Sequence, residues 1–142
     1  MASAHDVAAY ILKKQGSMDT WKLQKLVYYS QAWHLVWDSE PLFPARIEAW
    51  ANGPVVPLLF REHGGKFKMD SWPRGDSSRL TRPQKESINV VLKHYGRRTG
   101  FALRELTHEE PPWRKARRGL PPGASSNREI TRDAIASYYG SL

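Results

Sequence analysis

The stretch Thr20-Trp-Lys-Leu-Gln-Lys-Leu-Val-Tyr-Tyr-Ser-Gln-Ala-Trp-His-Leu-Val-Trp37 decides the fold of this chain. Ser17 or Asp19 can cap a helix that begins at about Thr20 and ends near Trp37. One side of this helix is apolar, and further apolar residues widen that side well beyond an ordinary surface stripe. A helix of this kind needs neighbours on several sides, so we predict that it lies at the centre of the fold.

The polar residues of the same helix are not scattered. At about 100° per residue, they fall within a sector of about 120°: Gln24, Tyr28, Gln31, His34 and Asp38. Such a sector is either a strip that hydrogen-bonds to another element of the protein or a face that recognises a partner. The sequence leaves both interpretations open.

The rest of the chain predicts a mainly α, compact single-domain bundle of about six or seven helices around the aromatic-rich helix. The domain spans residues 1–142. Residues 45–51 are expected to form a short helix or one arm of a minor hairpin near 41–51, and residues 66–80 an exposed, mobile loop. The other helices are expected at about 4–14, from Pro54 or Val55 to 63, and at 82–95, 100–107, 111–118 and 132–139. Three of them begin directly after a threonine that can cap the helix: Thr81, Thr99 and Thr131.

Composition is that of a globular protein, with 40% hydrophobic and 25% charged residues in a chain of 142. The absence of cysteine excludes disulfides and Cys-based zinc sites. No secretory signal and no apolar run of about 20 residues is present, which makes the cytoplasm the expected location and a membrane partner unexpected.

The net charge of +8 is unevenly distributed. Residues 1–60 carry five basic and five acidic side chains, whereas 17 basic and nine acidic ones lie beyond position 60. Such a field attracts nucleic acid, an anionic surface or an acidic protein partner, or it only aids solubility. The densest groups form a candidate basic contact surface: Arg97, Arg98, Arg114, Lys115, Arg117 and Arg118.

No motif of catalysis, metal binding or cofactor binding is visible. The five histidines lack the spacing of metal ligands, and no phosphate-binding loop or nucleophile elbow is present. Glu48 lies among apolar residues and needs a partner if buried, which Tyr28, Gln31, His34 or an arginine can supply. An enzyme hypothesis would require His108, Glu109 and Glu48 to converge in one pocket.

One further segment has both a structural and a functional interpretation. In Thr107-His-Glu-Glu-Pro-Pro-Trp113, Thr107 can cap a turn and Trp113 can anchor the next helix. Alternatively, His108 and Glu109 lie in a groove and contact a partner. Direct nucleic-acid binding is disfavoured because no helix-turn-helix, RNA-recognition or zinc-finger signature is present.

Three blocks in order resemble the Panacea domain, the SocA-like antitoxin family also labelled GepA-like phage-associated protein. They are Lys22-Leu-Gln-Lys-Leu-Val-Tyr-Tyr-Ser-Gln-Ala-Trp-His34, Ile47-Glu-Ala-Trp-Ala-Asn-Gly-Pro-Val-Val-Pro57 and Leu106-Thr-His-Glu-Glu-Pro-Pro-Trp113. The resemblance departs only slightly, with Phe60 where Tyr is expected and an additional Pro after Glu110.

The resemblance implies a non-enzymatic antitoxin, often encoded in prophages, that neutralises a cognate toxin by direct protein–protein binding. One branch is similar to a proteolytic adaptor that delivers a toxin to a AAA+ protease, and a nucleic-acid-binding regulator is a further alternative. The positive charge predicts an acidic contact face on the toxin. The motif residues, expected mostly to hold the scaffold, are Gln24, Lys25, Tyr28, Tyr29, Gln31, His34, Glu48, Trp50, Gly53, Pro54, Thr107, His108, Pro112 and Trp113.

Overall fold

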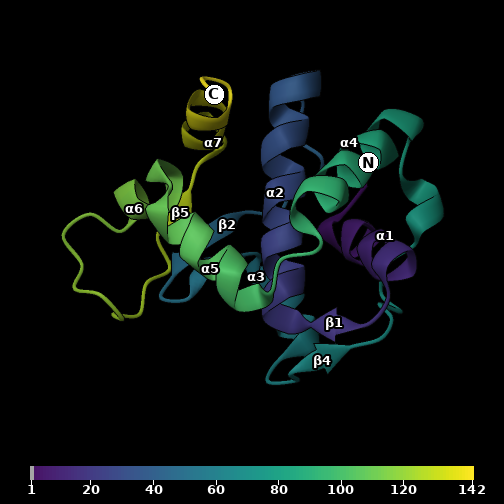
Figure 1. The fold of residues 1–142 in the computed structure, drawn as a ribbon, viewed down its shortest axis with the longest axis horizontal. Helices are drawn as coiled ribbons and strands as arrows, with labels where there is room; N and C mark the ends of the chain where they lie inside the picture. The colour runs from purple at the N-terminus through teal and green to yellow at the C-terminus, as the bar shows by residue number, and fades with distance from the viewer. Residues whose placement is uncertain (1) are drawn as a thin grey trace.

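A computed structural model describes residues 2–142, which form seven α-helices with one of them, α2, at the centre (Figure 1). Helix α2 contacts α1, α4, α5 and α7 as well as strand β3. Figure 1 shows α1 and α4 on one side of α2 and α5, α6 and α7 on the other. The helices are α1 (Ala4–Gln15), α2 (Thr20–Asp38), α3 (Pro57–His63), α4 (Arg82–Tyr95), α5 (Gly100–Glu109), α6 (Pro111–Ala116) and α7 (Arg132–Tyr139).

The prediction of a mainly α fold around α2 is confirmed. Asp19 caps the helix by accepting a hydrogen bond from the Lys22 backbone N–H at 2.7 Å. From Leu23 to Ala32 every residue of α2 is buried, because neighbours surround the helix on all sides. Only the last turn reaches the surface, where Trp37 is 45% exposed and stacks on Trp33.

A small sheet lies against α2. Strand β2 (Ile47–Trp50) pairs antiparallel with β3 (Gly53–Val55) and, on its other edge, with β5 (Glu129–Ile130). The hairpin alternative for residues 45–51 is thus the right one, although its second arm follows the turn at Ala51-Asn52 and the hairpin occupies 47–55. The predicted helix start at Pro54 or Val55 is wrong, because both residues are paired in β3 and the helix begins at Pro57.

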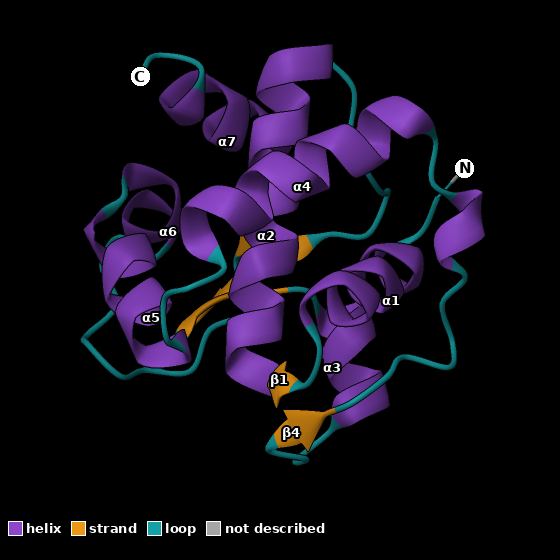
Figure 2. Ribbon diagram, turned by 45° about the vertical axis from the view of Figure 1, so that its right-hand side comes forward, coloured by secondary structure: helices purple, strands orange, loops and turns teal. Residues whose placement is uncertain are grey.

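Residues 66–80 were predicted to form an exposed mobile loop, and the structure corrects this in part: most of these residues are exposed, but the segment also contains a short strand, a 3-10 turn and buried anchors. Strand β4 (Lys68–Met69) pairs antiparallel with β1 (Met18–Asp19), side by side below the start of α2 (Figure 2). Trp72 is 3% exposed and donates from its indole N–H to His5 Nδ1 at 3.0 Å. A 3-10 turn, η1 (Ser77–Arg79), follows and contacts α1. The polar composition of the segment conceals these apolar anchors.

The predicted caps Thr81, Thr99 and Thr131 are confirmed at the starts of α4, α5 and α7. Thr107, predicted to cap a turn, instead lies inside α5 and donates from its hydroxyl to the Arg104 carbonyl at 2.8 Å. Helix α6 ends at Ala116 rather than Arg118. Among the helices described, none combines the length and apolar character needed to cross a bilayer.

Candidate partner-binding site

The polar sector of α2 is an internal hydrogen-bonding strip. Gln24 accepts from the Val56 backbone N–H at 2.9 Å and donates to its carbonyl at 3.3 Å. Gln31 accepts from the Leu42 N–H at 2.6 Å and donates to the Phe43 carbonyl at 2.9 Å. These residues hold the segment between α2 and α3 against the helix, and the alternative of a recognition face does not apply to them.

His34 completes the strip with a contact to another helix. Its Nδ1 lies 2.8 Å from the hydroxyl of Ser87 on α4, and the residue is 2% exposed. Burial lowers the pKa of His34 below its ordinary value, with the nearby Asp38 carboxylate acting in the opposite sense. Asp38 itself is exposed at the end of α2, so the strip ends at His34.

Tyrosines from α2 and α7 meet a carboxyl group at the start of α6. The hydroxyls of Tyr29 and Tyr139 donate to Glu110 Oε1 at 2.7 and 2.8 Å, and the hydroxyl of Tyr28 lies 3.0 Å from that of Tyr139. Burial raises the pKa of Glu110 and of all three tyrosines, although the hydrogen bonds from Tyr29 and Tyr139 act to lower that of Glu110. This network joins the first sequence block to the third.

Trp113 and Arg117 join the third block to the hairpin. Trp113 donates from its indole N–H to the Trp50 carbonyl at 2.8 Å and stacks on the His108 ring, with centroids 3.8 Å apart. Arg117, expected on the basic surface, is instead 5% exposed and donates to the Ala49 carbonyl at 2.9 Å. Its guanidinium is therefore part of the scaffold and must be removed from the candidate contact surface.

A buried amine lies where α2, the hairpin and α5 meet. Lys25 is 0% exposed, and its Nζ atom has no hydrogen-bond partner within residues 2–142. Burial and the neighbouring Arg104 guanidinium lower the pKa of Lys25 to about 7. The ammonium group lies 5.0 Å from the centroid of the Trp21 ring, a cation–π contact.

The turn of the hairpin makes room for this lysine. Gly53 has φ +121°, and a Cβ atom there would lie 2.6 Å from Lys25 Cε and 3.1 Å from Thr107 Oγ1. The position therefore requires glycine for both backbone conformation and space. His108 Nε2 is also buried without a partner among the described residues, and burial together with Arg104 lowers the pKa of His108 to about 4.

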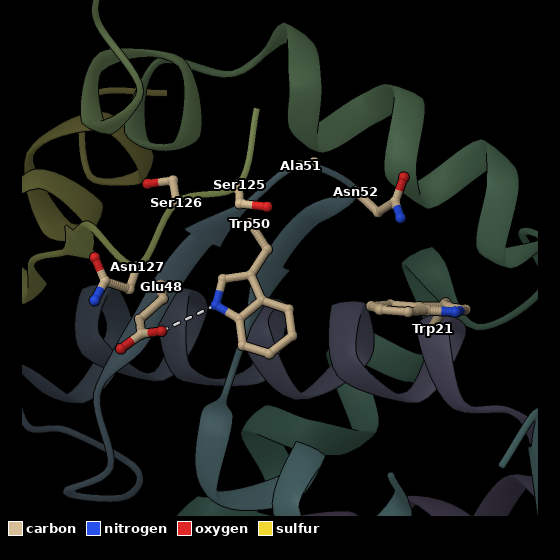
Figure 3. Close-up of a pocket in the computed structure, with 8 residues that line it drawn as sticks. All are labelled: Trp21, Glu48, Trp50, Ala51, Asn52, Ser125, Ser126 and Asn127. Atoms are coloured by element: carbon tan, nitrogen blue, oxygen red, sulfur yellow. Dashed lines mark hydrogen bonds between the residues drawn. The ribbon is translucent and has the colours of Figure 1, made fainter. Parts of the chain in front are cut away.

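Glu48 opens onto a pocket of about 530 Å³ beside the hairpin (Figure 3). Its Oε1 accepts from the Trp50 indole N–H at 2.9 Å, and its Oε2 accepts from Arg46 Nε at 2.9 Å. The arginine alternative for its partner is thus correct. His108 and Glu109 are not among the residues that line this pocket, so it does not unite the three residues of the enzyme hypothesis.

A second pocket, of about 410 Å³, shares Trp21 and Asn52 with the first. Lys25 and Arg104 line it, together with Phe67 and Phe101, which are 73% and 68% exposed. Sequence reasoning missed Trp21, Phe67, Phe101 and Arg104. The signal that could have drawn attention to Phe67 is its isolation between Lys66 and Lys68, whereas Phe101 lies beside Gly100 and Ala102 and gives no such signal.

The structure separates the remaining basic residues into two groups. Arg97 and Arg98 follow α4, and Arg98 lines a groove with Trp33 and Trp37. Arg114, Lys115 and Arg118 are exposed on and just after α6, where they line a different, shallow pocket. Of the fourteen motif residues, none is exposed; Glu48, Trp50, His108 and Trp113 are half-buried and the others are buried.

Fold and site together describe a helical domain with an internally bonded polar core, two adjoining pockets and exposed basic groups. Across residues 2–142 there is no cluster of three His, Asp or Glu side chains that could hold a metal ion. The sequence model of the family described as antitoxin SocA-like, Panacea domain matches residues 23–114, and the chain belongs to this family. Comparison with curated proteins and with solved structures gave no match.

Proposed function

We propose that this chain is an antitoxin that neutralises a cognate protein toxin by binding it directly. The observation that carries the proposal is the family match over residues 23–114, which includes the second and third blocks and all but the first residue of the first. In this proposal residues 1–142 act as one domain, which is supported by the packing of both α1 and α7 on α2.

The internal contacts support a binding function rather than a catalytic one. Two carboxylates of the motif blocks are engaged in the scaffold: Glu48 with Arg46 and Trp50, and Glu110 with two tyrosines. Motif residues that build the scaffold leave toxin specificity to exposed positions. The exposed basic residues Arg114, Lys115 and Arg118 would favour a toxin with an acidic contact face, because complementary charge accelerates encounter and excludes wrong partners.

Co-expression with the product of the adjacent gene tests the proposal. That product alone should arrest growth, and induction of this chain should restore it. A neighbouring product that is harmless, or that stays toxic with the chain present, contradicts the antitoxin function.

The lifetime of the toxin distinguishes masking from delivery to a AAA+ protease. Under the proposal, toxin half-life after synthesis is blocked stays the same, or lengthens, when the chain is present. A shortened half-life that depends on a AAA+ protease would assign the chain to the adaptor mechanism instead.

A further inference from the structure

We propose that the pocket beside Lys25 receives an acidic side chain of the toxin, an Asp or Glu carboxylate that the toxin presents between apolar neighbours. This inference rests on the proposed antitoxin function and names the contact that would serve it. The pocket has a volume of about 410 Å³ and lies between the start of α2, the hairpin turn at Asn52 and helix α5.

The Lys25 amine lacks a hydrogen-bond partner among the described residues. Buried polar groups in proteins are almost always hydrogen-bonded, and an unpaired buried ammonium group is costly. Lys25 is fully buried, and no acceptor of the described chain reaches its Nζ atom. A carboxylate from a partner would supply that acceptor and would also offset the repulsion from Arg104.

The lining of the pocket carries more basic than acidic side chains. Lys25 and Arg104 contribute positive charge, and Asp19 is the one acidic residue of the lining. Asp19 caps α2 by accepting from the Lys22 backbone at 2.7 Å and does not hydrogen-bond to Lys25. Arg104 Nε donates to Asn52 Oδ1 at 3.2 Å, which fixes the guanidinium beside the pocket, and its Nη1 atom pairs with the exposed Glu105 carboxylate at 2.8 Å. Within residues 2–142, Lys25 is therefore the cation of the lining that lacks an anionic partner, and the pocket is complementary to a single negative group.

Two exposed aromatic side chains also line the pocket. Phe67 and Phe101 line the pocket and are 73% and 68% exposed, so their rings gain nothing from the core of the protein. Aromatic side chains around a buried polar contact are typical of protein–protein hot spots, where they exclude water and strengthen the central charge pair. A protein surface loop with an acidic residue between apolar ones fits this arrangement.

A nucleic acid fits the pocket less well. Its bases can stack on exposed phenylalanines, but its negative charge lies on phosphates outside the bases. A base inserted between Phe67 and Phe101 would bring no anion to the buried Lys25 amine. Phosphates are better matched by exposed groups such as Arg114, Lys115 and Arg118 on another part of the surface.

Calorimetric titration with the adjacent gene product tests the site in three variants. Lys25→Met removes the amine but keeps the apolar stem, and Phe101→Ala truncates an exposed ring without touching the core. Each should weaken toxin binding at least tenfold, while the control Val90→Ala, at another exposed apolar position on α4, stays within twofold of wild type. Wild-type affinity in both Lys25→Met and Phe101→Ala overturns the proposal, and Phe101→Ala keeps it falsifiable if Lys25→Met does not fold.

A second measurement distinguishes failure of this binding site from failure of the proposed antitoxin function. If the wild-type chain neutralises no toxin, the antitoxin function fails, and the pocket is then decided by NMR of the full chain labelled at lysine side chains. The probes are acetyl-Leu-Glu-Phe-amide, its Gln counterpart and acetate. The proposal expects a saturable shift of the Lys25 signal by the Glu peptide at a concentration at least tenfold below that of either other probe. An equal response to all three, or no response of Lys25, overturns it.

Discussion

The Gln24 carboxamide hydrogen-bonds to both backbone polar groups of Val56, accepting from its N–H at 2.9 Å and donating to its carbonyl at 3.3 Å. This pair joins the first sequence block to the second inside the core, since Gln24 and Val56 are both 0% exposed. Gln24, which the sequence alone allows as part of a recognition face, therefore holds two segments of the core together.

Replacing Gln24 with Leu leaves the Val56 N–H and the His63 Nε2 atom, both buried, without their Gln24 partner, while the Val56 carbonyl still accepts from the Leu59 and Phe60 N–H groups. We expect the free energy of unfolding to fall by about 2–4 kcal/mol, since each unpaired buried group costs about 1–3 kcal/mol. Urea denaturation measures the loss. Glu86→Gln, which removes an exposed ion pair with Arg82, serves as the control and should change stability little. A Gln24→Leu variant as stable as that control would contradict the assigned role.

The buried Lys25 should make the free energy of unfolding depend on pH above about 7. Because burial lowers its folded pKa to about 7 from 10.5, the unfolded chain binds more protons between those values. The free energy of unfolding should therefore rise with pH from about 7 upward, by an amount on the order of a few kcal/mol. Measurements between pH 7 and 9 keep ionisation of the tyrosines small, and Lys25→Met should abolish most of the rise. Parallel profiles for the two proteins would show that the amine is not desolvated.

His108 should make the free energy of unfolding depend on pH in the acidic range as well. Its folded pKa is lowered to about 4 from 6.5, so the unfolded chain binds more protons in this range and stability is lost as pH falls through it. His108→Phe keeps a ring stacked on Trp113 and should reduce the loss, while the buried His34 and His63 continue to contribute in the same direction. Denaturation at pH 7 and pH 5 measures the difference. The exposed His94→Phe is the control, and a similar change in that variant would refute the assignment to His108.

Substitution of two neighbouring arginines should have different effects, on stability for Arg117 and on the rate of toxin binding for Arg114. Arg117→Met removes charged hydrogen bonds to the Ala49 and Ala124 carbonyls and should destabilise the fold by roughly 3 kcal/mol. The exposed Arg114→Met should leave the melting temperature within about a degree, because exposed substitutions rarely alter stability. In stopped-flow mixing with an acidic toxin, Arg114→Met should instead slow association, most clearly at low salt. Equal stability of the two variants would contradict the burial of Arg117.

Much of the fold was accessible from local signals in the sequence. The apolar breadth of residues 20–37 predicted a central helix, and threonines at 81, 99 and 131 marked helix starts that the structure confirms. These features depend on spacing and on side-chain hydrogen bonds within a few residues, which a sequence displays directly.

What the sequence concealed depends on contacts between distant residues. Trp72 is buried because it reaches His5, and Arg117 because the Ala49 and Ala124 carbonyls accept its protons. Both lie in polar or basic segments, where local composition indicates exposure. The pocket beside Lys25 also requires residues from four separate segments, so no spacing rule could assemble it.

Inhibition of purified toxin by the purified chain tests the central claim most directly. The neighbouring toxin is assayed for its own activity with increasing amounts of the chain and with no protease present. Toxin activity should fall to background as the chain reaches saturating amounts, and the two proteins should elute together in gel filtration. Undiminished toxin activity in the presence of excess chain, with the two proteins eluting apart, would contradict neutralisation by direct binding.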